Sequence, residues 1–179
     1  FVRFPLQIYS TNSPWVPPIW KEEMKRLDRE RGDFFQHSDA CLFLARNGKN
    51  KPVGRIAAIR FNRHLDVHDD GVGFFGFFEC IDDTAVSSAL FTAAEQWLRD
   101  QGLTRMRGPA SFTINDEIGL LIENFEDPPT LLTTWNPPYY QRLVEAAGLA
   151  KVEDLLARGM PVEEIDPEFV NRLTRVASR

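Results

Sequence analysis

The stretch from residue 74 to residue 109 constrains the fold more than any other part of this chain. It starts with Phe74–Cys80, an aromatic run that is apolar on both alternating faces, which predicts a central strand covered on both sides. The acidic pair Asp82–Asp83 then precedes an amphipathic helix, predicted over Ala85–Gln101. A glycine ends that helix, and Arg105–Arg107 is predicted as a short second strand. We therefore expect a sheet that contains both strands, with the helix packed against it.

Two further strands are predicted before this stretch. Ala40–Arg46 and Val53–Phe61 are joined by a loop that contains Asn47-Gly48, a dipeptide typical of β-hairpins. The apolar stripe of the helix, which includes Trp97, should pack on Val53–Phe61 and on Phe74–Cys80, so these two strands should be neighbours. The predicted fold class is α/β (α+β): a twisted, mixed, mostly antiparallel sheet with helices on both faces.

The flanking segments are assigned from the same periodicities and from turn residues. Strands are predicted at Val2–Tyr9, Leu131–Trp135 and Lys151–Leu156. Helices are predicted around Ile19–Leu27 and from Asn136 to about Ala147, with Asn136 as the cap and proline in the first turn.

We expect one domain over residues 1–158 and a helical connector over residues 159–179. The connector helix should open at Asp166-Pro167, and its apolar face has no partner in the predicted sheet domain. A connector of this kind would lead to a second domain. The chain begins with Phe1 rather than Met, which suggests that an N-terminal piece has been removed or left out.

Composition excludes several classes of partner. The formal net charge is −5 and the pI is about 5.3, which disfavours a nucleic-acid partner or an anionic membrane surface. No apolar run approaches the roughly 20 residues of a membrane span, and no signal-peptide pattern opens the chain. Cys41 and Cys80 lie in apolar strand-like runs and are interpreted as reduced core residues, which favours a cytoplasmic location.

The order of hairpin, aromatic strand, helix and short strand over about residues 40–109 resembles the core of the GNAT (N-acetyltransferase) superfamily, as does the sequence SALFTAAEQWLRDQG. The motifs GFFGFFE, GPxSFxxNDExGLLI and NPPYY resemble those of uncharacterised bacterial GNAT-like proteins of roughly twice this length. The resemblance implies a GNAT-like acyl-CoA N-acyltransferase fold and acyl transfer to a small-molecule amine or a protein amine. It also implies that the chain is an N-terminal half whose partner is a second GNAT-like domain.

The resemblance also indicates where a cofactor would bind. In the family, an Arg/Gln-x-x-Gly-x-Gly/Ala turn opens the helix, and its backbone N–H groups receive the pyrophosphate of coenzyme A. The two glycine positions are Ala85 and Ser87 here, and the basic position is Asp82. Small residues still allow a close approach, whereas carboxylates would repel a pyrophosphate. Acetyl-CoA or another acyl-CoA is therefore expected to bind weakly or not at all, and the candidate cofactor-binding residues are Cys80, Ile81, Ala85, Val86, Ser87 and Ser88.

Amine acylation needs a base for the amine and a proton donor for the leaving thiolate. Glu79 ends the central strand, where GNAT enzymes often place their base, and its apolar neighbours should desolvate it and raise its pKa. Alternatively, Glu79 points outward and pairs with Arg105 or Arg107.

Two segments compete for the later helix of the family, Asn115–Phe125 and Asn136–Leu149. In the second alignment Val144 takes the place of the usual tyrosine acid, and two tyrosines lie one turn earlier. The polar run Asn115–Glu117 is either part of a site or the cap of a helix. The candidate catalytic residues, expected around a cleft between the Glu79 strand and Arg105–Arg107, are Glu79, Asn115, Asp116, Tyr139 and Tyr140.

Other chemistry is not indicated. His64 and His68 have a spacing that suits a metal on a helix, but the sequence predicts a polar loop there, with no further ligand in view. No metal is therefore expected. The alternative to catalysis is a GNAT-like ligand-binding or scaffold domain that supports a second acetyltransferase half.

Overall fold

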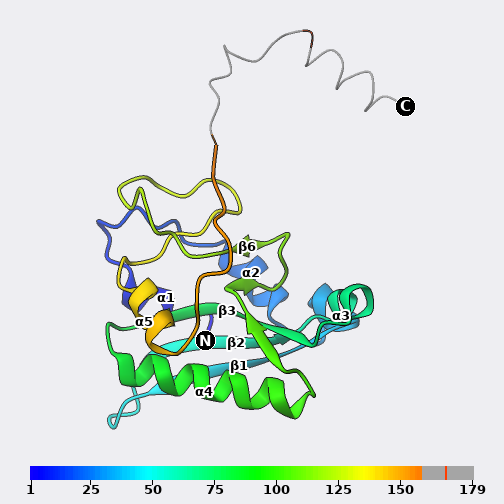
Figure 1. Cartoon of the computed structure of the whole chain (residues 1–179). Helices are drawn as coiled ribbons and strands as arrows, with labels where there is room; N and C mark the ends of the chain where they lie inside the picture. Colours follow the sequence, from blue (N-terminus) through cyan, green and yellow to red (C-terminus); the bar gives the residue numbers. More distant parts are fainter. Residues whose placement is uncertain (159–167, 169–179) are drawn as a thin grey trace.

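A four-stranded sheet organises the computed structural model, which describes residues 1–158 and residue 168 (Figure 1). The strands lie in the order β1-β2-β3-β4. β1–β2 and β2–β3 are antiparallel, whereas β3–β4 is parallel, so the predicted mixed, mostly antiparallel sheet is confirmed. The strand bounds are β1 Asp39–Arg46, β2 Pro52–Arg60, β3 Val72–Cys80 and β4 Arg105–Arg107.

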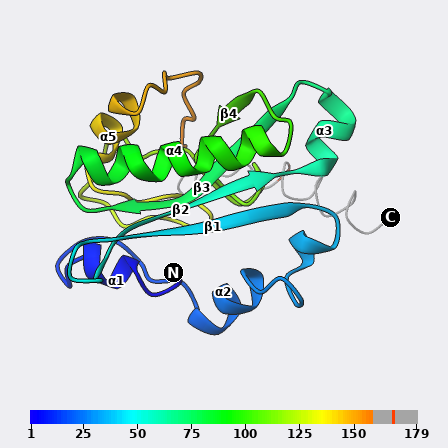
Figure 2. The same cartoon turned by 90° about the horizontal axis from the view of Figure 1, so that it is seen from below.

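Helices cover both faces of this sheet (Figure 2). One face carries α4 (Thr84–Asp100) and α5 (Tyr140–Ala146), two helices that the sequence predicted. The other face carries α1 (Pro5–Ile8), α2 (Trp20–Arg26) and the 3₁₀ helix η1 (Asp33–Gln36). The remaining elements are α3 (Asn62–His68), which joins β2 to β3, and the short strands β5 (Ala110–Ser111) and β6 (Glu117–Ile118), which pair with each other.

β3 is the centre of the core, and each of its residues is buried. Phe75 and Phe78 pack towards α4 and α5. Phe74 and Phe77 pack on the other side, against Phe112 and the residues around η1. The aromatic pattern of this strand therefore correctly predicted a strand covered on both faces.

β2 and β3 are neighbours, as expected, but the helix α4 packs mainly on β2 and β1 and contacts β3 less than predicted. Its fully buried stripe includes Leu90, Phe91 and Ala94. Trp97, which the pattern placed in this stripe, is only partly buried at its edge. The aromatic anchor of the helix is therefore Phe91, which contacts both Phe75 and Phe78.

Several predicted elements are wrong. Val2–Tyr9 forms α1 rather than a strand, because Pro5 supplies no N–H to a ladder and fits the first turn of a helix. Leu131–Trp135 and Lys151–Leu156 contain no strand and consist of a turn and irregular chain. The loop predicted around His64 and His68 is the helix α3.

The remaining predictions have different outcomes. Asn136 does not cap α5, which begins at Tyr140 without a side-chain cap. The helix predicted to open at Asp166-Pro167 lies outside the described residues, apart from residue 168. Cys41 and Cys80 are free thiols, as expected. Among the described helices, none combines the length and the apolar character that a membrane span needs.

Phe91→Ala should lower the free energy of unfolding by about 3–5 kcal/mol, because it removes a large aromatic side chain that is 1% exposed. Trp97→Ala should cost less, since part of that ring already contacts solvent. Urea unfolding followed by circular dichroism measures both values. A larger loss for Trp97→Ala than for Phe91→Ala would contradict this description of the core.

Candidate functional site

An extra residue in β3 determines where the side chain of Glu79 points. Arg55 lies opposite Glu79, and Ala57 lies opposite Gly76. An advance of three residues along β3 therefore corresponds to an advance of only two along β2. This is a β-bulge, in which Phe77 adopts a left-handed conformation with φ 52°. Such a bulge reverses the alternation of side chains beyond it. Glu79 therefore faces away from α4, on the same side of the sheet as Arg55.

A second feature of the bulge is its close contact with β5. A Cβ atom at Gly76 would lie 2.1 Å from the carbonyl oxygen of Ala110, so only glycine lets the two segments cross here. The N–H of Phe77 donates to the Ser111 hydroxyl at 3.0 Å. The bulge is thus held by β5. Because β5 follows β4 along the chain and includes Ser111, this segment also forms one wall of the site.

Glu79 has three side-chain partners, although it is only 8% exposed. The hydroxyls of Tyr9 and Tyr140 both donate to its Oε2, each at 2.6 Å. A nitrogen of Arg55 lies 3.5 Å from its Oε1. Short bonds to one carboxylate oxygen and a cation beside the other satisfy most of its acceptor capacity.

Two consecutive tyrosines attach α5 to the end of β3. The Tyr140 hydroxyl accepts the N–H of Cys80 at 2.9 Å while it donates to Glu79. The Tyr139 hydroxyl donates to the carbonyl of Cys80, also at 2.9 Å. Tyr140 is 1% exposed. Its role is to position Glu79 and the strand end.

Burial controls the ionisation of these groups. Desolvation raises the pKa of Glu79, and this effect exceeds the opposite effects of Arg55 and of the two tyrosine hydroxyls. Desolvation and the nearby Glu79 carboxylate raise the pKa values of Tyr9 and Tyr140 well above the usual tyrosine value. The hydroxyls therefore remain protonated donors, and Glu79 is a stronger base than an exposed carboxylate.

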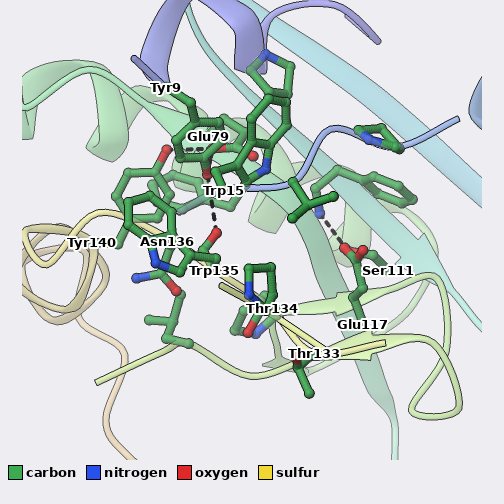
Figure 3. Close-up of a pocket in the computed structure, with 18 of the residues that line it drawn as sticks. Tyr9, Trp15, Glu79, Ser111, Glu117, Thr133, Thr134, Trp135, Asn136 and Tyr140 are labelled. Carbon is green, nitrogen blue, oxygen red and sulfur yellow. Dashed lines mark hydrogen bonds between the residues drawn. The ribbon is translucent and has the colours of Figure 1, made fainter. Parts of the chain in front are cut away.

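Glu79 lies in a pocket with a volume of about 180 Å³ (Figure 3). Aromatic rings form one side: Tyr9 stacks on Trp15 at 4.4 Å between ring centroids and meets Trp135 edge-on at 5.6 Å. Other polar groups that line the pocket are Glu23, Arg26, Arg55, Ser111, Glu117, Thr133, Thr134 and Asn136. Amphipathic walls around a buried carboxylate suit a cationic ligand.

The structure brings some of the sequence-predicted residues to this pocket and not others. Glu79 and Tyr140 line it, whereas Tyr139 bonds to the backbone beside it. Asn115 is exposed and does not line the pocket. Asp116 accepts from the N–H and the hydroxyl of Thr113, so it closes its own turn.

The alternative in which Glu79 points outward and pairs with Arg105 or Arg107 is wrong, because Glu79 is buried and its cationic partner is Arg55 on β2. Asn115–Phe125 is not a helix, so the helix that follows β4 is α5. Asn136, which the sequence assigned to the cap of α5, instead bonds to Leu121. Its side-chain amide accepts the backbone N–H of Leu121 and donates to the Leu121 carbonyl. This link fixes the loop that carries Trp135 over the pocket.

Sequence reasoning missed Tyr9, Arg55 and Trp15. Arg55 had a detectable signal, since a charged residue inside the apolar strand Val53–Phe61 needs a buried partner. Tyr9 and Trp15 had none, because their segment was assigned to a strand and a loop far along the chain from Glu79. Only the folded arrangement of α1 against β3 brings them to the site.

The start of α4 holds the candidate cofactor-binding residues. The carboxylate of Asp83 accepts from the N–H groups of Ala85 and Val86 at 2.8 and 3.3 Å, and so caps the helix. Asp82 forms an ion pair with Arg142 of α5. The N–H groups that the resemblance assigns to a pyrophosphate therefore bond to a carboxylate of the chain itself.

The other candidates at this turn are less available to a ligand. The N–H of Ile81 donates to the carbonyl of Val53 at 3.1 Å. The Ser87 side chain is buried and donates to Thr84, and Ser88 is partly buried. Burial, with Asp83 and Asp82 nearby, raises the pKa of the Cys80 thiol to about 12.

The two histidines of α3 stand apart from this pocket. His64 contacts Asp70 at 3.1 Å and Phe74 edge-on, and its ring centroid lies 4.5 Å from that of His68. Within residues 1–158 and residue 168, no group of three or more His, Cys, Asp or Glu side chains is arranged to hold a metal.

Two curated bacterial proteins are similar to this chain. "Bacterial ceramide synthase" of Caulobacter vibrioides is 37% identical over 174 residues, which cover 96% of this chain and 45% of that protein. "Protein YghO" of Escherichia coli is 36% identical over 159 residues, or 88% of this chain and 40% of that protein. The chain thus spans less than half the length of the curated relatives it matches. No family model matches the sequence.

One solved structure is also similar. It is a putative acetyl transferase from Pyrococcus furiosus, with a TM-score of 0.47 and 14% sequence identity over 88% of each chain.

Glu79→Gln should become progressively more stable relative to the wild type as the pH rises. Burial raises the pKa of Glu79 above its usual value of 4.5. At pH values between about 4.5 and the pKa of Glu79 in the folded protein, the folded state therefore holds a proton that the unfolded chain has lost. The stability of the wild type must therefore fall as the pH rises through this range, and glutamine removes that titration. Urea unfolding from pH 4 to pH 8 measures the difference.

The matched control for this experiment is Glu145→Gln, which changes an exposed carboxyl on α5 whose partner is Gln141. Its effect on the free energy of unfolding should be small at every pH. The raised pKa would be contradicted if the difference in free energy of unfolding between Glu79→Gln and the wild type did not change with pH. It would also be contradicted if the wild type became the relatively more stable protein at high pH.

Proposed function

We propose that this chain forms the amine-binding part of a GNAT-like N-acyltransferase and that Glu79 accepts the proton of the acceptor amine. The observation that supports this most is a buried carboxylate at the end of β3 that lines an aromatic pocket and receives two hydroxyl hydrogen bonds of 2.6 Å. A buried carboxylate with a raised pKa is the group that a general base requires near neutral pH.

The chemistry asks for one proton acceptor and one proton donor. The amine nitrogen attacks the thioester carbonyl, the C–S bond breaks, and an amide and a thiol result. Before attack the ammonium must lose a proton, which Glu79 takes in this proposal. A second proton leaves the nitrogen as the amide forms, and the leaving thiolate gains one. In this proposal Glu79 releases the first proton to solvent, takes the second from the nitrogen and passes it to the leaving thiolate, so one proton is released overall.

Tyr9 is the group that would connect Glu79 to the substrate. Its hydroxyl bonds to Glu79, and its ring lines the pocket between Trp15 and Trp135. An amine at this hydroxyl could pass its proton to Tyr9 while Tyr9 passes its own to Glu79. Tyr140 cannot act in the same way, because its hydroxyl is buried against Cys80 and Glu79.

The acceptor class is proposed from the relatives. One relative is named a ceramide synthase, and a ceramide is the amide of a fatty acid with a long-chain amino alcohol. We propose an acceptor of the same class for this chain. The pocket volume of about 180 Å³ is smaller than the roughly 300–1,000 Å³ of drug-sized sites. It suits a polar head group, with the hydrocarbon chain leaving past the aromatic rings.

The acyl donor is proposed to bind mainly outside the start of α4. There the Asp83 carboxylate bonds to the N–H groups that a pyrophosphate would need, and Asp82 adds a second carboxylate. A second GNAT-like domain is our candidate for the donor site, since the curated relatives are more than twice as long as the matched segment. The same carboxylates favour a second candidate function, a non-catalytic ligand-binding or scaffold domain.

The activity test uses the complete protein with a long-chain acyl-CoA and a long-chain amino alcohol. Mass spectrometry detects the amide, and a thiol reagent detects released coenzyme A. Glu79→Gln should reduce kcat/KM by about 10²-fold or more, as loss of a general base does. Glu145→Gln should retain the wild-type rate, since that side chain is exposed on α5.

An unchanged rate in Glu79→Gln would exclude Glu79 as the base. Absence of amide with every acyl-CoA, together with retained binding of the amino alcohol, would favour the non-catalytic candidate.

Coenzyme A should bind weakly or not at all at the start of α4. Asp83→Ser keeps a residue that can cap the helix but removes the charge, and Asp82→Lys inverts the neighbouring charge. Each change should strengthen binding in isothermal titration of coenzyme A. Micromolar affinity in the wild type that neither change alters would show that the phosphates bind elsewhere.

A further inference from the structure

Two arginines that line the pocket each carry one unpaired buried donor. Within residues 1–158 and residue 168, the side-chain nitrogens and oxygens that are buried without a hydrogen-bond partner are Nη2 of Arg26 and Nε of Arg55. Both side chains line the same pocket as Glu79. Buried guanidinium donors without an acceptor are costly, which indicates that an oxygen atom of a ligand completes them.

Contacts on its other sides hold Arg26 in place. Its Nη1 lies 3.3 Å from an Oε of Glu23, one turn earlier in α2. Its guanidinium lies over the rings of Phe77 and Phe112, 5.0 and 5.6 Å from their centroids. These contacts hold the guanidinium against two aromatic rings and leave Nη2 without a protein acceptor, so the Nη2 donor is held in place before any ligand arrives.

The charges around the pocket indicate the kind of oxygen that fits. Two guanidinium groups and three carboxylates line it: Arg26, Arg55, Glu23, Glu79 and Glu117. Negative groups therefore exceed positive ones by one when all are ionised. A head group with a carboxylate or a phosphate would add to that excess. A cationic amine that carries a neutral oxygen satisfies both the carboxylates and the unpaired donors.

We infer that Arg26, supported by Arg55, is the specificity-determining residue for a neutral oxygen of the acceptor, a hydroxyl or a carbonyl next to the amine. This inference rests on the proposed function, because it places the amine at Tyr9 and Glu79. The pocket volume of about 180 Å³ limits the separation of the two polar groups. A compact head group with the amine and the oxygen on neighbouring carbons fits this volume, and a simple alkylamine leaves both guanidinium donors unpaired.

The experiment compares three probes with the same eight-carbon skeleton: octylamine, 2-amino-1-octanol and 2-aminooctanoate. Binding to the complete protein is followed through tryptophan fluorescence, since Trp15 and Trp135 line the pocket, and by isothermal titration. We expect 2-amino-1-octanol to bind about tenfold or more tightly than octylamine, as a hydrogen bond to a charged donor implies. 2-Aminooctanoate should bind more weakly than the amino alcohol.

Arg26→Gln should lower the ratio of the two dissociation constants well below the wild-type value, with Arg55 left as the single donor, and should not weaken octylamine binding, because it removes a positive charge from a pocket that holds a cationic amine. A purely structural role of Arg26 would weaken both ligands together. The control is Arg31→Gln, which changes an exposed arginine outside the pocket and should keep the wild-type ratio. Should Arg26→Gln fail to fold in thermal melts, Arg26→Lys takes its place; it keeps the charge but loses the planar fork, so its ratio should fall below that of the wild type.

Equal affinity of the wild type for octylamine and 2-amino-1-octanol would overturn this inference and leave the proposed function intact. A wild-type ratio in the Arg26 variants, or tightest binding of 2-aminooctanoate, would also overturn it. Absence of binding by all three amines, even at millimolar concentration, would overturn this inference together with the proposed amine site.

Discussion

The rest of the site depends on one buried carboxylate. Glu79 is 8% exposed at the end of the central strand, and a carboxylate in such a place needs partners. Arg55 from β2, Tyr9 from the segment after α1 and Tyr140 from α5 supply them. Three parts of the chain, up to 70 residues from Glu79 in sequence, are thereby held at one point. The pocket is the space that these groups leave between them.

That arrangement requires the β-bulge at Phe77. Side chains alternate along a strand, so without the extra residue Glu79 would point into the apolar layer under α4. The bulge moves it to the face that carries α1, α2 and β5. Gly76 and the Ser111 hydroxyl make the bulge possible, one by permitting close contact with β5 and the other by accepting the N–H of Phe77.

The start of α4 illustrates how a fold and its chemistry separate. The strand, helix and strand over residues 74–109 form as the sequence indicates, with Asp83 as an effective helix cap. The cap also occupies the N–H groups that bind anions at the start of other helices. A side chain that stabilises the helix thus competes with a ligand for the same donors. Function at this turn therefore follows from the side chains and not from the fold.

The sequence by itself determined the order of β1, β2, β3, α4 and β4, because apolar periodicity and turn residues are local signals. It also marked Glu79 as a desolvated carboxylate from its apolar neighbours. Only the tertiary structure decided the partners of Glu79, since Arg55, Tyr9 and Tyr140 come from distant segments whose meeting no local pattern encodes. The segment of Tyr9 was assigned to a strand, and the bulge that orients Glu79 has no periodic signature. Pairing of buried polar groups is a property of the whole packed chain, which satisfies them in three dimensions.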